Sequence, residues 1–414
     1  MKEYLDKKGI LFEYQSGFRG KYSTDTCLAD ITDYVKGEIA AGNLVGMVCI
    51  DLQKAFDTVA HDTLLEKLQA INVSNSAVNW FESYLSCRQQ CVDVNGTRSD
   101  FLEVTCGVPQ GSILGPQLFL IYINDMYSCL NCRLSLYADD SALFFSHKDA
   151  KVIADRLSIE LSNCKRWLTD NKLSLHVGKT ECLIFGTTRK LNKVGDFSVS
   201  CDGTAVTRVS SVKYLGVILD SNLNGAQHVV KLIKKCSGRI SFLYRNSAML
   251  DANCRKILCT ALVQPYLDYC SSSWYNGITK SLKNKLDVLQ RRMIRFINSY
   301  GPRHHVDEKD AKALSWLLVK DRVDFFKAVH VHKVVQKKAP SYLCRRFVPV
   351  LNTHSHNTRG SSKNFFISKE LSRSLSSFSY TAAIVWNKLP VELKEIESEK
   401  RFRQKVREYL MSAY

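Results

Sequence analysis

The sequence predicts an α+β fold made of two or three folding units. Its 414 residues are too many for one ordinary domain. Residues 44–219 contain short apolar runs of strand length between segments with helical spacing, whereas the pattern after residue 224 is helical throughout. Hydrophobic residues make up 45% and charged residues 24%, a mix that is typical of globular proteins and excludes a disordered chain.

Strands are predicted where short apolar runs end at turn residues. The run at 44–50 follows Gly42-Asn43 and is expected to be a buried strand. Two further runs, at 134–137 and 142–145, flank Ala138-Asp139-Asp140-Ser141 and predict a hairpin with a polar turn. Shorter strands are expected at 173–176, 181–185 and 212–219.

Helices are predicted where apolar residues recur every three or four positions. Residues 57–71 show this spacing, and further helices are expected at 78–85, 151–168 and 392–409. Residues 282–297 predict an amphipathic helix with a basic side. Its apolar face is formed by Leu282, Leu286, Leu289, Met293, Ile294 and Ile297. We expect a break at 301–305 and a loop at 352–362.

The positive charge is concentrated in the C-terminal part of the chain. The formal net charge is +18. Residues 221–414 hold 35 Lys and Arg against 14 Asp and Glu, a net of +21, which leaves 23 against 26, a net of −3, for residues 1–220. An excess that extends over almost two hundred residues favours binding to nucleic acid through counterion release over a merely solvated surface.

The cysteines and the chain start predict an intracellular protein, nuclear or cytoplasmic and not secreted. The 15 cysteines are odd in number and scattered, and the charged N-terminus has no apolar leader, so we expect free, mostly buried thiols. Cys129-Leu130-Asn131-Cys132 has no partner pair at zinc spacing, and His354 and His356 lie in a predicted loop, so no zinc site is expected. No apolar run reaches the ~18 residues that span a bilayer, so no membrane partner is expected.

Three carboxylates follow predicted strands at positions that can meet. Asp51 ends the run at 44–50, and Asp139 and Asp140 lie in the predicted hairpin turn. A carboxylate at the end of an apolar strand is costly unless it faces solvent, a cation or a metal. Together at one sheet edge, the three can hold two Mg²⁺ ions about 4 Å apart for phosphoryl transfer. The alternative is an ordinary polar turn, in which Asp is common.

Six short motifs follow one another over roughly residues 15–220. They are Gln15-Ser16-Gly17-Phe18-Arg19; Asp51-Leu52-Gln53-Lys54-Ala55-Phe56-Asp57-Thr58-Val59; Gly107-Val108-Pro109-Gln110-Gly111-Ser112 with Leu114-Gly115-Pro116; Tyr137-Ala138-Asp139-Asp140; Trp167-Leu168 with Asn171-Lys172-Leu173 and Lys179-Thr180; and Tyr214-Leu215-Gly216-Val217. In this order they resemble the reverse transcriptase family, and in particular the polymerases of non-LTR (LINE-type), jockey-like retrotransposons. Two further stretches, 352–362 and 377–390, look like the C-terminal region of animal retrotransposon polymerases.

The resemblance implies a right-hand polymerase. It consists of truncated, partial fingers (1–43), a palm with a central antiparallel sheet and the remaining fingers elements (44–222), a helical basic thumb (223–300) and a basic helical C-terminal region (301–414). The implied activity is RNA-directed DNA synthesis, in which a DNA primer 3′-OH is extended with dNTPs on an RNA template. Oligomeric state is not predicted.

The resemblance also assigns roles to residues. Asp51 and Asp139, with Asp140 close by, would be the catalytic metal ligands for two Mg²⁺ ions, with Mn²⁺ as an alternative. Phe56 would pack beneath the incoming sugar and reject a 2′-OH by bulk, which implies use of dNTPs.

Four further residues are implied to act on the nucleotide or the phosphates. Gln110 would bond near the templating base or sugar, and Gly111, with Gly107 and Gly115, would let the backbone approach closely. Lys179 would meet pyrophosphate or donate a proton. Arg19 would contact the triphosphate or the template.

Two alternatives stay open beside the polymerase. Family members carry more fingers residues before the motif at Gln15 and an endonuclease domain, so we expect a fragment, a decayed copy or a co-opted remnant. Such a chain would bind RNA or an RNA–DNA hybrid without catalysis. The other alternative, a group II intron-type maturase, requires a splicing domain that we do not identify in the sequence.

Overall fold

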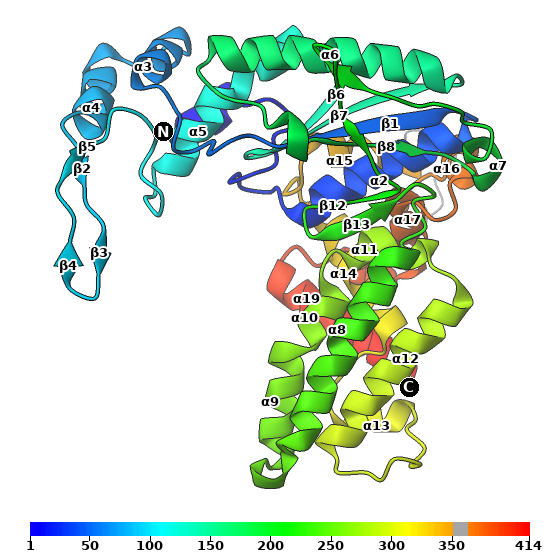
Figure 1. The fold of residues 1–414 in the computed structure, drawn as a ribbon. Coiled ribbons are helices and arrows are strands. Elements are labelled where there is room, and N and C mark those ends of the chain that lie inside the picture. Colours follow the sequence, from blue (N-terminus) through cyan, green and yellow to red (C-terminus); the bar gives the residue numbers. More distant parts are fainter. Residues whose placement is uncertain (351–362) are drawn as a thin grey trace. The chain divides into compact units, whose positions relative to one another are not determined.

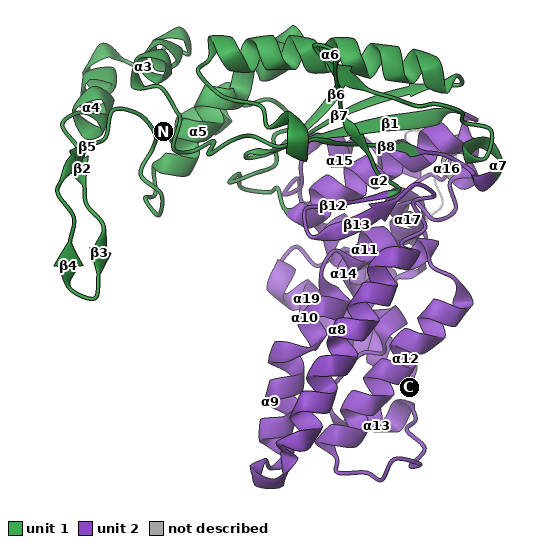
Figure 2. Cartoon of the chain, in the orientation of Figure 1, with its two compact units in different colours: residues 1–23, 43–184, 189–210 green, residues 24–42, 185–188, 211–414 purple. Residues whose placement is uncertain are grey.

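The computed structural model describes residues 1–350 and 363–414, and these form two compact units (Figures 1 and 2). Unit 1 comprises Met1–Ser23, Asn43–Ile184 and Arg189–Ser210; unit 2 comprises Thr24–Gly42, Phe185–Thr188 and Ser211–Tyr414. Strands and helices mix in unit 1, whereas unit 2 is helical apart from one hairpin, which confirms the α+β class. The predicted loop at 352–362, with His354 and His356, lies outside the described residues.

A five-stranded sheet forms the core of unit 1, in the order β11-β8-β1-β7-β6. The strands are β1 (Leu44–Ile50), β6 (Arg133–Tyr137), β7 (Asp140–His147), β8 (Glu181–Phe185) and β11 (Thr207–Arg208). β1 pairs antiparallel with β7, and β7 pairs antiparallel with β6, so the predicted hairpin is confirmed. Six of the seven residues of β1 are buried, as expected of an apolar run at the centre of a sheet.

Helix α6 (Ala150–Asp170) packs against β1 and β7, as Figure 1 shows, and confirms the helix predicted at 151–168. Its buried side chains include Ile153 and Leu157. A Cβ on Gly46 of β1 would lie only 2.4 Å from Ile153 Cγ2 and 2.5 Å from Leu157 Cδ1. A glycine at this position therefore lets the helix approach the sheet closely.

Helices α3 (His61–Ala70) and α4 (Asn75–Leu85) confirm the helices predicted at 57–71 and 78–85. α3 begins later than predicted because residues 56–60 bond across the chain instead. The Gly107 amide donates to the Val59 carbonyl (2.7 Å), and the Val108 amide donates to the Phe56 carbonyl (2.9 Å).

The other elements in this part of the chain are α1 (Lys2–Lys8), β2 (Gln89–Gln90), β3 (Asp93–Val94), β4 (Thr97–Arg98), β5 (Leu102–Glu103), α5 (Gly115–Ile123), η1 (Asn124–Cys129), η2 (Val177–Lys179), α7 (Thr188–Leu191), β9 (Ser200–Cys201) and β10 (Thr204–Ala205).

One strand prediction was wrong, and another covers two strands instead of one. The run at 173–176 contributes only an isolated bridge between Leu175 and Leu52, and the 3-10 helix η2 follows it. The run at 212–219 is two strands, β12 (Ser211–Tyr214) and β13 (Val217–Asp220). Leu215 and Gly216 between them have φ of 44° and 79°, so the chain reverses in a tight turn.

Unit 2 is built from helices, as predicted for the chain after residue 224. They are α2 (Thr24–Ala40), α8 (Ala226–Arg245), η3 (Ser247–Met249), α9 (Ala252–Leu262), α10 (Gln264–Asp268), α11 (Ser271–Trp274), η4 (Tyr275–Gly277), α12 (Lys280–Ile297), α13 (Glu308–Ala313), α14 (Val319–Val335), α15 (Ser341–Cys344), α16 (Lys369–Arg373), α17 (Phe378–Lys388), α18 (Val391–Lys394) and α19 (Glu399–Met411). The apolar face predicted for 282–297 is buried in α12. The helix predicted at 392–409 is interrupted between α18 and α19, where the Ser398 hydroxyl caps α19 by accepting from the Arg401 amide.

Helix α2 belongs to unit 2, where three of its aspartates are held. Asp25 lies 2.8 Å from His330 Nε2, and Asp30 accepts from Arg346 Nη2 at 2.8 Å. Asp33 accepts from the amides of Phe378 (2.6 Å) and Ser379 (2.9 Å) at the start of α17. The compact units thus do not follow the four predicted regions, whose functional labels stay predictions.

The 15 cysteines are free thiols, and seven of them are buried, so the expectation that most are buried was wrong. In the described part of the chain no helix combines the length and the apolar character needed to cross a membrane.

Candidate active site at the β6–β7 turn

The register of the sheet brings the three candidate carboxylates to one edge. Ile50 of β1 lies opposite Ser141 of β7, so Asp51, the next residue, comes level with Asp140. Tyr137 pairs with Asp140, which leaves Ala138 and Asp139 as a two-residue turn. Ala138 has φ of 56°, the left-handed conformation that such turns require. All three carboxylates lie in unit 1.

The three carboxylates form one concentration of negative charge. Burial, and then the charges of Asp139 and Asp51, raise the pKa of Asp140 above its ordinary value. Within the described residues no Lys, Arg or His side chain forms an ion pair with any of the three. Uncompensated carboxylates of this kind attract a divalent cation.

The donor chemistry of this site fits Mg²⁺, which prefers carboxylate oxygens. The side chains do not yet surround an ion: among the described residues, no three His, Cys, Asp or Glu side chains are placed to hold a metal together. The edge therefore supplies oxygen donors and negative charge rather than a closed ligand cage.

The N-terminal segment holds the turn in place. The buried Gln15 side chain accepts from the amides of Ala138 and Gly17 through Oε1, both at 2.9 Å. The Ser16 amide donates to the Leu136 carbonyl at 2.8 Å, so the segment lies beside β6. A Cβ on Gly17 would lie 2.4 Å from the Ala138 nitrogen, so this position requires glycine. Gln15 and Gly17 are thus positioning residues for the turn that carries Asp139.

The backbone after α6 holds Asp51 from the other side. The His176 amide donates to the Asp51 carbonyl (2.8 Å), and the Gln53 amide donates to the Ser174 carbonyl (2.9 Å). This backbone pairing explains why the apolar run at 173–176 looks like a strand in the sequence, although it forms only one bridge.

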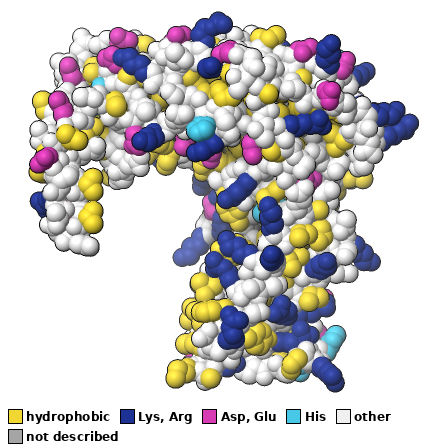
Figure 3. Space-filling model, in the orientation of Figure 1, with side chains coloured by type: hydrophobic (Ala, Val, Ile, Leu, Met, Phe, Trp, Pro, Cys, Tyr) yellow, Lys and Arg dark blue, Asp and Glu magenta, His cyan; other side chains and the backbone are white. Residues whose placement is uncertain are grey.

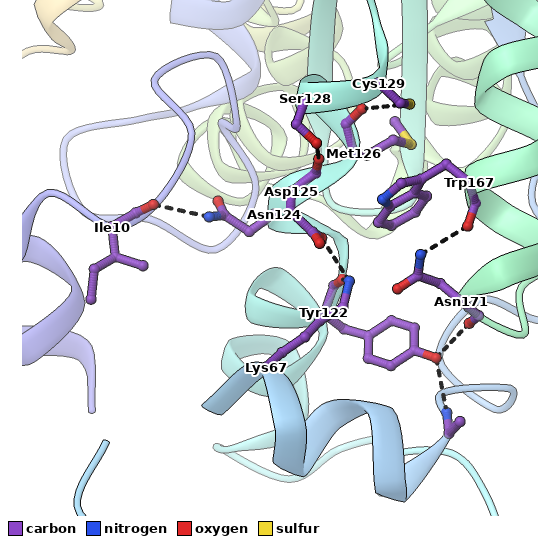
Figure 4. Close-up of polar contacts among 11 residues, drawn as sticks. Ile10, Lys67, Tyr122, Asn124, Asp125, Met126, Ser128, Cys129, Trp167 and Asn171 are labelled. Atoms are coloured by element: carbon purple, nitrogen blue, oxygen red, sulfur yellow. Dashed lines mark hydrogen bonds and ion pairs between the residues drawn. The ribbon is translucent and has the colours of Figure 1, made fainter. Parts of the chain in front are cut away.

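A polar network fixes the start of that segment at Asn171 (Figure 4). The Tyr122 hydroxyl donates to the Asn171 carbonyl and accepts from the Ala60 amide. Lys67 Nζ donates to the Tyr122 carbonyl (2.7 Å) and to Asp125 (2.6 Å), and it lies 4.7 Å from the Trp167 ring centroid. Helices α3, α5 and α6 are thereby joined at the residue that follows α6.

Phe56 follows Asp51 by five residues and has aromatic support. It is half-buried, and its ring stacks on the buried Phe119 of α5 with centroids 4.3 Å apart. Phe18 meets it edge-on at 6.3 Å. The ring is therefore held in one orientation while part of it stays accessible.

The glycine-rich segment 107–115 packs against the same loop. Gln110 Nε2 donates to Asp57 Oδ1 at 2.7 Å, which orients the amide. Gly107 has φ of 89°, and a Cβ there would lie 2.7 Å from the Asp57 carbonyl oxygen. Gly111 has φ of 83° with open space around it, so its backbone is accessible.

Arg19 and Lys179 differ in their contacts with the rest of the chain. Arg19 Nη1 donates to the carbonyls of Phe12 (2.8 Å) and Gln15 (3.0 Å), and its guanidinium lies 4.2 Å from the Tyr22 ring centroid. Lys179 ends η2 and is exposed. Arg19 therefore supports the segment that holds the Asp139 turn, in addition to any contact with a ligand.

Several functional residues found here had no predicted role. Gln15 and Gly17 stood in a family motif without an assigned task, and Tyr122 and Asn171 were not singled out as site residues. A polar Tyr inside the apolar run 118–123 was the one signal available for Tyr122. Their partners lie far away in sequence, so composition and spacing alone could not find them.

Comparison with known proteins places this site in a family. Residues 2–219 match the family described as reverse transcriptase (RNA-dependent DNA polymerase). A probable RNA-directed DNA polymerase from transposon BS of Drosophila melanogaster is 29% identical over 72% of this chain and 34% of its own length. The RNA-directed DNA polymerase from mobile element jockey of Drosophila funebris is 28% identical over 69% of this chain and 32% of its own length.

A solved structure of telomerase from Candida tropicalis aligns with 100% of this chain and 55% of that chain, at 13% identity and a TM-score of 0.41. The chain spans about a third of the length of the curated relatives it matches. These relatives confirm the resemblance to jockey-like retrotransposon polymerases. Because the family match covers more than half of the 414 residues, the chain belongs to the reverse transcriptase (RNA-dependent DNA polymerase) family.

Proposed function

We propose that this chain is an RNA-directed DNA polymerase that extends a DNA primer 3′-OH with dNTPs on an RNA template. The observation that carries the proposal is the carboxylate edge, where Asp51 comes level with Asp140, and where burial and then the charges of Asp139 and Asp51 raise the pKa of Asp140. Phosphoryl transfer needs positioning and neutralisation of charge, and this edge is arranged for both.

Asp51 and Asp139, with Asp140 beside them, would hold two Mg²⁺ ions, or Mn²⁺ in their place. Such ions neutralise charge on the transferred phosphoryl group and on the leaving oxygen. The protein's part is to keep the carboxylates at the end of β1 and in the β6–β7 turn. Gln15 and the 174–176 segment support this by holding the backbone of each.

Other residues would act on the nucleotide and its phosphates. Phe56, held by Phe119, would exclude a 2′-OH by bulk. Gln110 would bond near the templating base or the sugar, and the open backbone at Gly111 would let it approach. Lys179 and Arg19 would contact phosphates, with Arg19 also supporting the turn.

We propose palm and thumb functions within the right-hand arrangement. Residues 44–222 would form the palm with fingers elements, 1–43 partial fingers, 223–300 the thumb and 301–414 a basic C-terminal region. Figure 3 shows Lys and Arg side chains spread over the part of the molecule that Figure 2 colours as unit 2. On α8 the exposed cations include Lys231, Lys234 and Lys235. Such helices would follow the phosphates of a template–primer duplex.

Primer extension tests this proposal. Poly(rA)–oligo(dT) is incubated with Mg²⁺ and dTTP, beside a control that carries Asp139→Ala and Asp140→Ala. We expect extension by the unchanged chain, none by the control, and equal binding of the hybrid by both. If the substitutions weaken hybrid binding as much as extension, the metal-site assignment is wrong. Binding of the hybrid should also weaken steeply with added salt, and a flat salt response would contradict the thumb assignment.

A second candidate function is binding of RNA or an RNA–DNA hybrid without catalysis. The observation that favours it is the lack, in the described residues, of three side chains already placed to hold a metal. Hybrid binding without extension in either Mg²⁺ or Mn²⁺ would support this candidate over the polymerase.

A further inference from the structure

A basic cavity of about 740 Å³ opens in unit 2, and Asp51, Asp139 and Asp140 are not among the residues that line it. Four helices and the turn before α14 contribute to it: α9, α10, α14 and α19. Its cations are Lys256, Arg322, Arg403 and Arg407. No carboxylate is among the described residues that line the cavity. A basic pocket assembled from helices far apart in sequence is a built feature rather than a charged stretch of one helix.

Two of these four cations are neutralised from outside the cavity. Arg322 forms a two-pronged pair with Asp268 through Nε and Nη2, and Arg403 pairs with Glu399 at 2.8 Å. The Arg407 guanidinium donates to the Ser315 carbonyl at 2.8 Å, a neutral partner. In the described part of the chain no carboxylate pairs with Lys256 or Arg407. The cavity therefore keeps two uncompensated positive charges.

The like charges are close enough to affect one another. Burial, and then the charge of Arg322, lower the pKa of Arg407. An anion bound between these cations would relieve that repulsion. Because the guanidinium groups are planar with several donors, a phosphate is the anion that they hold best.

Aromatic rings line the same cavity. Phe325 and Phe326 of α14 are half-buried, with ring centroids 5.5 Å apart. Arg322 lies 5.7 Å from the Phe326 ring centroid. Accessible rings beside phosphate-binding cations are how proteins hold single strands, since bases stack on the rings while the backbone meets the charges.

We propose that this cavity binds a segment of single-stranded nucleic acid, with Lys256 and Arg407 on the phosphates and Phe325 and Phe326 against the bases. A base-paired duplex has its bases stacked internally and cannot use the rings, so the cavity selects unpaired strands. This site goes beyond the proposed polymerase function and requires no catalysis.

Fluorescence anisotropy tests the site on the full chain. The probes are labelled 15-nucleotide single strands of mixed sequence, one of RNA and one of DNA, titrated over a range of NaCl concentrations. The variant carries Lys256→Ala and Arg407→Ala. The matched control carries Lys400→Ala and Arg401→Ala, which remove two exposed cations near the start of α19 that do not line the cavity.

We expect the cavity variant to bind single strands about tenfold more weakly at 0.1 M NaCl than the control does. The slope of log affinity against log salt should shrink by about 1.4, because each phosphate contact on a single strand contributes about 0.7. Comparing the affinities of the RNA probe and the DNA probe shows whether the cavity prefers ribose or deoxyribose. Equal affinity and equal slope for the variant and the control would overturn the proposal.

A second variant tests the rings. Phe325→Leu with Phe326→Leu keeps apolar packing and should weaken single-strand binding at least about fivefold, with the melting temperature measured beside it. A polyglutamate peptide should displace the strand from the unchanged protein much less well than unlabelled RNA does. If both compete equally, the cavity recognises charge alone and the nucleic-acid proposal is wrong.

The test of the cavity can succeed or fail independently of the primer-extension test of the polymerase. Single-strand binding is measured without primer, dNTPs or Mg²⁺, so its dependence on the cavity does not require the carboxylate edge. If the unchanged chain fails to extend a primer but its single-strand binding still depends on the cavity, the polymerase proposal fails and this one stands.

Discussion

Two sets of three aspartates, one in each unit, show what makes a carboxylate functional or structural. In unit 1, Asp51, Asp139 and Asp140 gather at strand ends, and burial, together with the charges of Asp139 and Asp51, raises the pKa of Asp140. In unit 2, the three aspartates of α2 are each given a partner: His330 for Asp25, Arg346 for Asp30, and the start of α17 for Asp33. Residue type and number are the same in both sets.

The difference lies in how burial is compensated. Burial opposes the charge of Asp25, but His330 and the Ser272 hydroxyl more than offset it, so the pKa of Asp25 is lowered. At Asp140 burial acts in the same direction, but the neighbours are carboxylates and add to it. At Asp33 burial outweighs Arg346 and Ser379, so its pKa is raised although it has partners. The two sets therefore differ in their partners: those of α2 are held by protein groups, whereas those of unit 1 stay available to a cation.

The largest expected effect is on catalysis in unit 1. Asp51→Asn keeps the shape of the side chain and removes its charge, so primer extension should fall by about 10³-fold or more. The free energy of unfolding should not decrease. The matched control is Asp100→Asn, an exposed aspartate of the same unit. A loss of less than tenfold in the Asp51 variant would remove this residue from the metal site.

The next effect is on stability in unit 2. Asp33→Ala leaves the buried amides of Phe378 and Ser379 without their acceptor, so unfolding should become easier by about 3 kcal/mol. Hydrogen exchange of α17 measures this. Glu392→Ala, which removes an exposed carboxylate in the same unit, should change it by less than about 0.5 kcal/mol. Equal protection of α17 in both variants would show that Asp33 does not fix this helix.

A smaller effect is expected in unit 1 at Phe56, where the bulk of the side chain matters and not a charge. Phe56→Ala should raise incorporation of ribonucleotides relative to deoxyribonucleotides by about tenfold or more, because the bulk that meets the 2′-OH is gone. Phe56→Tyr, which keeps the ring, should leave discrimination within about threefold. Competition between rUTP and dTTP in single-nucleotide extension measures both. Unchanged discrimination in the alanine variant would leave Phe56 as a packing residue on Phe119.

The smallest effect is a gain in stability. Asp140→Asn removes one of three like charges, so the metal-free protein should unfold less readily at pH 7, and solvent around the exposed Asp140 keeps this gain below about 1 kcal/mol. Because the pKa of Asp140 is raised in the folded state, its contribution to stability is lost as pH rises above the ordinary carboxyl pKa and through the raised one. Thermal melts at pH 5 and pH 8 should therefore differ less in the variant. A variant that melts below the unchanged chain at pH 8 would mean that Asp140 has a stabilising partner.

Local sequence patterns predicted the elements that carry the site. The all-apolar run at 44–50 became β1, and the two runs around Asp139-Asp140 became β6 and β7 with the turn between them. These elements were predictable because each is decided by its own residues and by a turn at its end. The strand predicted at 173–176 does not form because its backbone pairs with residues 51–53 in only one bridge. That pairing depends on residues 51–53, which the local pattern at 173–176 does not include.

The roles of single residues were also predictable only where nearby sequence decides them. Positions after predicted strands pointed to Asp51, Asp139 and Asp140, the motif order added Phe56 and Gln110, and these stay the proposed site residues. The motif order gave no task to Gln15, whose amide oxygen bonds to Ala138, 123 positions away. It left the aspartates of α2 outside the site but could not name their partners, which lie more than two hundred residues further along the chain.

The sequence by itself determined the family, the class of fold, the positive charge of the C-terminal part and the identity of the carboxylates. All of these depend on residue types and on short spacings. Only the tertiary structure decided that α2 joins the C-terminal helices, that Gln15 supports the β6–β7 turn, and that Lys256 and Arg407 line one cavity. These features depend on contacts between distant segments, which form when the chain buries its apolar faces and pairs its buried charges, and no local pattern records them.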